Sequence, residues 1–175
     1  MSRALTLLYG ALAYLVFFPT FLYAVGFVEN FVVPKSIDSG GEGALIPSLV
    51  INAALLSVFA LQHSVMARPG FKAWWTQLVP KPVERSTYVL LASLALILLY
   101  WFWRPLTAPV WSVEPGLLAD ALTAVSWIGF GIVLISTFLI SHFELFGLQQ
   151  VFERFAGRSL APLEFKTPGF YRYVR

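Results

Sequence analysis

Residues 5–28 read LTLLYGALAYLVFFPTFLYAVGFV, an apolar run without a charged side chain. Crossing the hydrocarbon core of a bilayer takes about 20 such residues, and a cleaved signal peptide has a core of only about 7–15. The run therefore predicts a retained transmembrane helix. Comparable runs follow at residues 45–61, 87–103 and 118–140. Together they predict an all-α fold, a polytopic membrane helix bundle with four transmembrane helices.

The composition excludes two other classes of protein. Of the 175 residues, 58% are hydrophobic and 12% are charged, and the mean hydropathy is +0.75. Soluble domains carry about 25% charged residues, and disordered chains combine low hydrophobicity with high charge. A formal charge of +3 in a membrane protein indicates the cytoplasmic face rather than a nucleic-acid partner. The absence of cysteine excludes disulfides, thiolate metal ligands and a cysteine nucleophile.

The Lys and Arg residues divide unevenly between the two sides of the predicted bundle. Assigning successive segments to alternate sides places ten of the 12 on one side. Only Lys35 and Arg104 fall on the other side. Because cytoplasmic segments of membrane proteins carry the excess of Lys and Arg, the sequence predicts that both termini are cytoplasmic.

The tail after the fourth run changes character. Apolar residues recur at helical spacing from Leu148 to Phe155, polar residues lie between them, and Gly157 is a suitable stop. Residues 141–157 are therefore predicted to form a cytoplasmic amphipathic helix, and the proline-containing stretch 158–175 a short irregular tail. The predicted organisation is a four-helix transmembrane region over 1–140, this helix, and the tail.

Two histidines end predicted transmembrane helices on the cytoplasmic side. His63 follows the second run and His142 the fourth, and an imidazole near neutrality can act as a general base. As a pair they could also ligate haem from two helices, or both could be ordinary interfacial residues. Glu144 would share an aqueous edge with Gln149 or Gln150. His63, His142 and Glu144 are thus the catalytic candidates, and no metal-binding or phosphate-binding motif is visible.

Three further polar residues have structural interpretations beside functional ones. Asn52 is the deepest polar residue of the second run and is predicted to hold helices together or to bind a ligand. Ser86 is predicted to cap the third helix. Arg85 could clamp a carboxylate or phosphate, or it could be a cytoplasmic anchor.

Three blocks of sequence carry a resemblance to a known family. They are LQHSVMARPGFKAWW at residues 61–75, ERSTYVLLASLALILLYWFWRP at 84–105 and SHFELFGLQQVF at 141–152. These blocks resemble the nurim-like membrane family, which includes bacterial methanethiol S-methyltransferases and denitrification-associated relatives. The ending GFYRYVR, residues 169–175, resembles the start of the G-x-Y-x-x-x-R-H-P motif of isoprenylcysteine carboxyl methyltransferases.

The resemblance implies a multi-pass protein of the bacterial inner membrane that transfers a methyl group from S-adenosyl-L-methionine to a small thiol, turning methanethiol into dimethyl sulfide. By position, Gly169, Tyr171 and Arg175 would open the cofactor-binding segment. His-Pro and a further helical region follow this arginine in the family, so we expect the chain to be the front part of a longer protein. The partners implied are the lipid bilayer and a small thiol, without nucleic acid or metal. The alternative is a non-catalytic nurim-like protein, structural or accessory to a respiratory or denitrification complex.

Overall fold

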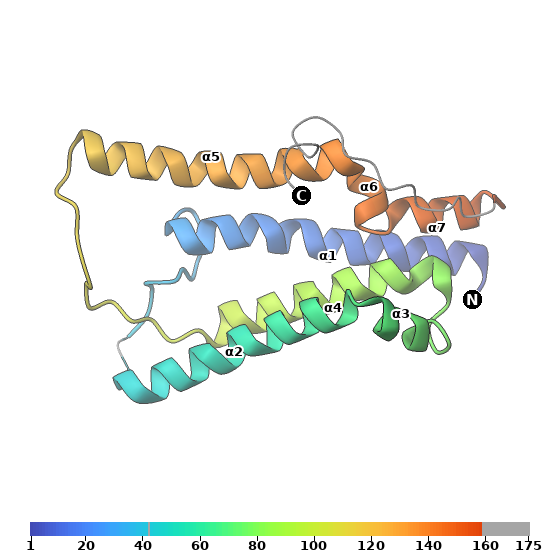
Figure 1. Ribbon diagram of the computed structural model, residues 1–175, viewed down its shortest axis with the longest axis horizontal. Coiled ribbons are helices and arrows are strands. Elements are labelled where there is room, and N and C mark those ends of the chain that lie inside the picture. Colours follow the sequence, from blue (N-terminus) through green and yellow to red (C-terminus); the bar gives the residue numbers. More distant parts are fainter. Residues whose placement is uncertain (42, 159–175) are drawn as a thin grey trace. The chain divides into compact units, whose positions relative to one another are not determined.

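The computed structural model describes residues 1–41 and 43–158, which form helices and no strand (Figure 1). The helices are α1 (Arg3–Glu29), α2 (Leu45–Met66), α3 (Pro69–Trp75), α4 (Lys81–Phe102), α5 (Leu117–Ile140), α6 (His142–Leu145) and α7 (Leu148–Phe155). These helices belong to two compact units. The first holds residues 1–107 and 146–158, hence α1 to α4 and α7, and the second holds residues 108–145, hence α5 and α6.

Four of the helices are long and apolar enough to cross a membrane, namely α1, α2, α4 and α5. This confirms the all-α fold with four transmembrane helices. The largest extensions beyond the predicted apolar runs occur in α2, which continues to Met66, and in α4, which begins at Lys81. The polar residues at these ends are therefore helical.

The earlier start of α4 corrects the prediction for Ser86. The cap position of α4 is occupied by Pro80, and Ser86 lies inside the helix, fully buried. Its hydroxyl donates to the carbonyl oxygen of Gly147 at 3.5 Å. The prediction failed because Lys81, Glu84 and Arg85 interrupt the apolar pattern without interrupting the helix.

Helix α4 is the centre of the first unit, since α1, α2 and α7 all pack against it. It runs parallel to α1: Tyr9 Oη lies 3.0 Å from Thr87 Oγ1, and Tyr100 Oη donates to the carbonyl of Thr20 at 3.3 Å. It runs antiparallel to α2 (Figure 1). The buried core of Phe27, Leu55, Leu99 and Tyr100 lies where α1 and α4 end and α2 begins.

Asn52 holds the end of α4 against α2. Its Nδ2 donates to the carbonyl oxygen of Arg104 at 2.7 Å, and its Oδ1 accepts from the backbone N–H of Arg104 at 2.9 Å. The side chain is buried. Of the two predicted roles, the structure supports the one that holds helices together.

The Asn52→Ala variant is expected to be less stable by about 1–2 kcal/mol, because it leaves two backbone groups of Arg104 unpaired and interhelical hydrogen bonds in membranes are of this size. Thermal unfolding in detergent measures the change. Ser57→Ala is the matched control, since the Ser57 hydroxyl bonds only within α2, to Ala53. Equal midpoints for the two variants would contradict the assignment.

The predicted amphipathic helix over residues 141–157 is divided in the structure into α6 and α7. Gly147, with φ of +86°, separates them. From there α7 packs along the start of α1, where the fully buried Val151 faces Gly10. A Cβ on Gly10 would lie 2.5 Å from Val151 Cγ2, so glycine is required for this approach. Gly157, with φ of +73°, follows the end of α7 as predicted.

Candidate active site

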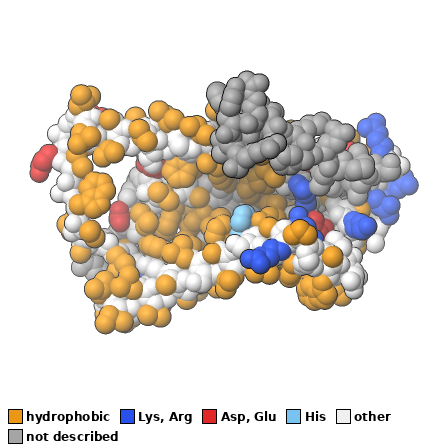
Figure 2. Space-filling view, viewed as in Figure 1, with side chains coloured by type: hydrophobic (Ala, Val, Ile, Leu, Met, Phe, Trp, Pro, Cys, Tyr) orange, Lys and Arg blue, Asp and Glu red, His pale blue; other side chains and the backbone are white. Residues whose placement is uncertain are grey.

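Basic side chains gather at one end of the first unit. This end comprises the start of α1, the end of α2, α3, the start of α4, and α7 (Figure 2). We call it the basic end, and its Lys and Arg residues are Arg3, Arg68, Lys72, Lys81, Arg85, Arg154 and Arg158. Among the described residues of this unit, only Lys35 and Arg104 lie at the opposite end. The packing of α1, α2 and α4 thus places together the segments that the charge pattern assigned to one side.

His63 is placed at the basic end, in the last turn of α2. Its Nδ1 lies 2.9 Å from Tyr88 Oη of α4, and Tyr88 Oη also donates to the carbonyl oxygen of His63 at 3.2 Å. The ring of Phe59 stacks on the imidazole at 5.4 Å. These contacts hold the imidazole in one orientation. The side chain of His63 is nevertheless exposed, so it remains accessible.

The two contacts with Tyr88 are compatible with a proton on Nδ1 of His63. A phenol has one hydrogen, and a carbonyl oxygen can only accept it. When Tyr88 Oη donates to the carbonyl, Nδ1 must be the donor in the 2.9 Å contact. In that tautomer the lone pair lies on Nε2, which makes neither of the two contacts with Tyr88. This arrangement suits a general base.

Gln62 lies beside this pair and has an unusual amide. Its Nε2 donates to the carbonyl oxygen of Tyr88 at 3.3 Å and contacts Met66 Sδ at 3.2 Å. Its Oε1 is buried and accepts no hydrogen bond from the described part of the chain. A buried acceptor without a donor is costly, so an N–H group from outside these residues would be favourable here.

His142 belongs to the second unit and has its own partners. Thr137 Oγ1 donates to the carbonyl of Leu134 at 2.7 Å, so His142 Nδ1 donates to Thr137 Oγ1 at 2.8 Å. The ring of Phe138 stacks on the imidazole at 4.2 Å. Burial lowers the pKa of His142, which favours the neutral form. Ser141, just before it, has φ of +151°, a rare conformation for a residue other than glycine.

The lowered pKa of His142 predicts a dependence of stability on pH. The unfolded chain binds a proton near pH 6.5, whereas the folded chain binds it only at lower pH. Stability is therefore fully present above pH 6.5 and is lost as the pH falls through that value toward the folded pKa. We expect the unfolding midpoint of wild type to drop more between pH 7.5 and 5.5 than that of His142→Gln. Parallel pH profiles would contradict this.

The remaining candidates have different positions. Glu144 lies in α6, two residues after His142 and in the second unit. Gly169, Tyr171 and Arg175 lie outside the described residues. Within residues 1–41 and 43–158, no group of three or more His, Cys, Asp or Glu gathers where a metal ion could bind.

Sequence reasoning missed Tyr88 and undervalued Gln62. Both residues lie at the edge of an apolar run. They meet because α2 and α4 pack antiparallel in a register that brings residues 62–63 opposite residue 88. The only signal in the sequence was that a polar residue near the end of the second apolar run and one near the start of the third could lie opposite each other in antiparallel helices.

These features define a class: a multi-pass, all-helical membrane protein with a histidine, tyrosine and glutamine cluster at a basic helix end. Comparison with known proteins identifies the family within this class. The chain is 55% identical to methanethiol S-methyltransferase 1 of Bradyrhizobium diazoefficiens over 99% of its own length and 61% of that protein. It is 52% identical to methanethiol S-methyltransferase of Crocosphaera subtropica over its whole length and 69% of that protein.

A more distant relative is mouse Nurim, 32% identical over 96% of this chain and 71% of the mouse protein. No family model and no solved structure matches the chain. The chain belongs to the family of bacterial methanethiol S-methyltransferases and nurim-like membrane proteins, as the sequence blocks predicted.

Proposed function

We propose that the protein is a membrane methyltransferase that transfers a methyl group from S-adenosyl-L-methionine to a small thiol, methanethiol giving dimethyl sulfide. The observation that carries the proposal is the identity of 52–55% with two proteins named methanethiol S-methyltransferase, spread over 99–100% of this chain. Mouse Nurim, whose similarity leaves the alternative of a nurim-like accessory protein, is only 32% identical.

The reaction requires little from the protein beyond positioning and removal of a proton. When bound, the cofactor would supply a methyl group on a sulfonium, and the residues of this chain would hold the thiol in line with it and take its proton. Thiols ionise near pH 8.5 or above, so a base raises the reactive fraction at neutral pH. We assign this role to His63. Its imidazole is exposed, and its contacts with Tyr88 fit the tautomer that has the lone pair on Nε2.

The basic end has groups that suit such a cofactor. Its carboxylate would be attracted by the Lys and Arg side chains gathered there, and its amino groups could donate to the buried Oε1 of Gln62. Gly169, Tyr171 and Arg175 remain the proposed opening of the cofactor-binding segment, on the resemblance of residues 169–175 to the methyltransferase motif. His142 and Glu144 remain alternative catalytic candidates.

The proposed location is the bacterial inner membrane with the basic end in the cytoplasm, where a charged cofactor is available and where positive residues accumulate. A reporter that is active only in the cytoplasm should be active when fused after Arg175 and inactive when inserted at Ser39–Gly40. A periplasmic reporter should give the reverse pattern. The opposite result at both positions would overturn the orientation and leave the proposed site facing the wrong compartment.

The activity is tested directly with the protein expressed from its complete gene in a host that makes no dimethyl sulfide. Membranes are supplied with methanethiol and cofactor carrying a labelled methyl group, and the headspace is analysed for labelled dimethyl sulfide. Membranes from the same host with an empty vector are the control. Labelled product above that control supports the proposal; saturable cofactor binding without any product would point to another acceptor, and neither binding nor product to a non-catalytic role.

A further inference from the structure

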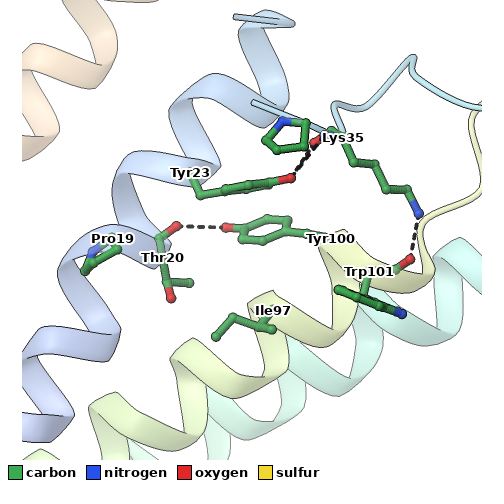
Figure 3. Close-up of a pocket in the computed structure, with 8 residues that line it drawn as sticks. Pro19, Thr20, Tyr23, Lys35, Ile97, Tyr100 and Trp101 are labelled. Carbon is green, nitrogen blue, oxygen red and sulfur yellow. Dashed lines mark hydrogen bonds between the residues drawn. The ribbon is translucent and has the colours of Figure 1, made fainter. Parts of the chain in front are cut away.

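A cavity of about 510 Å³ opens between α1 and α4 at the end opposite the basic end. Side chains of α1 and α4 form its walls, and the loop between α1 and α2 closes its rim (Figure 3). The wall residues are Pro19, Thr20 and Tyr23 of α1 with Ile97, Tyr100 and Trp101 of α4. All of them lie in the second half of two membrane-spanning helices, so the cavity lies within one half of the bilayer.

The walls of the cavity offer almost nothing to a polar ligand. Tyr23 Oη donates to the carbonyl oxygen of Lys35 at 2.8 Å, and Tyr100 Oη donates to that of Thr20 at 3.3 Å. Thr20 Oγ1 donates within its own helix, to Val16 at 2.7 Å. The hydroxyl hydrogens are thus already used, and the surface left for an occupant is ring, proline and aliphatic carbon. A charged cofactor would be bound poorly by such walls.

One charged group stands at the rim. The side chain of Lys35 extends from the loop toward α4, where Nζ donates to the carbonyl oxygen of Trp101 at 2.6 Å (Figure 3). An ammonium has three hydrogens, so two remain for another acceptor. Partial burial lowers the pKa of Lys35, and the nearby positive charge of Arg104 lowers it further. Arg104, three residues after Trp101, adds a second positive charge near Lys35, and within residues 1–41 and 43–158 no carboxylate pairs with Lys35.

We infer that this cavity binds an anionic phospholipid, with one acyl chain between α1 and α4 and the phosphate at Lys35 and Arg104. An apolar cavity with a cationic rim at bilayer depth complements a molecule that is apolar along its length and negative at one end. A thiol with two heavy atoms would occupy a small part of 510 Å³, given that a water molecule takes about 30 Å³. The inference does not depend on the proposed methyl transfer.

The test uses the full chain in vesicles of phosphatidylcholine that contain a small fraction of brominated lipid, either phosphatidylglycerol or phosphatidylcholine. Bromine quenches tryptophan on contact, and the contribution of Trp101 is the difference between the protein and its Trp101→Phe variant. We expect half-maximal quenching of Trp101 at about fivefold less brominated phosphatidylglycerol than phosphatidylcholine, which corresponds to the ~1 kcal/mol that one Lys near a membrane surface contributes.

Two variants separate the cavity from general attraction to the bilayer. Lys35→Gln should abolish the preference for phosphatidylglycerol, and Ile97→Phe, which adds bulk to the wall, should weaken quenching by both lipids. Lys72→Gln at the basic end is the matched control and should keep the preference. Equal quenching by the two lipids in wild type, a preference that survives in Lys35→Gln, or an equal loss in Lys72→Gln would each overturn the inference. None of these readouts involves methyl transfer.

Discussion

Replacing His63 with alanine is expected to lower kcat for methyl transfer to methanethiol by about 10²- to 10⁴-fold, the usual contribution of a general base. The imidazole is exposed, and its Nδ1 is engaged by Tyr88 at 2.9 Å, so the variant removes Nε2 without disturbing a buried contact. The KM for the cofactor should change little, because no role in binding it is assigned to His63. Initial rates of labelled dimethyl sulfide formation in membranes measure both constants.

A structural role for His63 would give a different pattern. The deficit of His63→Ala should shrink for thiols of lower pKa, since these are already ionised at neutral pH and need no base. It should persist unchanged if the side chain only supports the fold. Tyr88→Phe should have a smaller effect, about tenfold, because it releases the orientation of the imidazole and keeps the base itself. A larger loss in His142→Ala than in His63→Ala would transfer the assignment to His142.

Replacing Gly147 with alanine should detach α7 from the first unit. A Cβ at this position would lie 2.8 Å from the backbone nitrogen of Ser86, and the residue has φ of +86°. The left-handed conformation costs about 1–2 kcal/mol for a residue with a side chain, and overpacking a further 1–3 kcal/mol. The midpoint of thermal unfolding in detergent should therefore fall by roughly 4–20 °C, at about 2–4 °C per kcal/mol for a chain of this size.

The absence of cysteine provides a second measurement for the same variant. Val151 is fully buried against Gly10, so a Val151→Cys reporter should react slowly with a maleimide in the otherwise unchanged protein. Adding Gly147→Ala should speed the reaction strongly. Gly70→Ala in α3 is the matched control, because a Cβ there meets no atom within 4 Å. Slow labelling in both backgrounds would show that α7 tolerates the substitution.

The transmembrane helices were predictable because long apolar runs are set by the thickness of the bilayer and need no knowledge of neighbours. The grouping of basic residues followed from the same runs. The site was harder, since it depends on register. Nothing in the sequence tells that Tyr88 meets His63, or that Ser86 faces Gly147 instead of capping a helix. These contacts arise when two helices pack at a particular offset, and apolar residues on every face leave that offset open.

The parallel pairing of α1 with α4 also has a consequence for how the chain enters the membrane. Tyr9 and Thr87, which meet between these helices, are 78 residues apart in sequence. At a synthesis rate of about 5–20 residues per second, roughly 4–16 seconds pass between the synthesis of Tyr9 and that of Thr87. During that interval its inward-facing hydroxyls have only lipid, its own backbone or the insertion machinery to bond to. We therefore expect the first helix to be synthesised well before the third membrane-spanning helix, against which it packs.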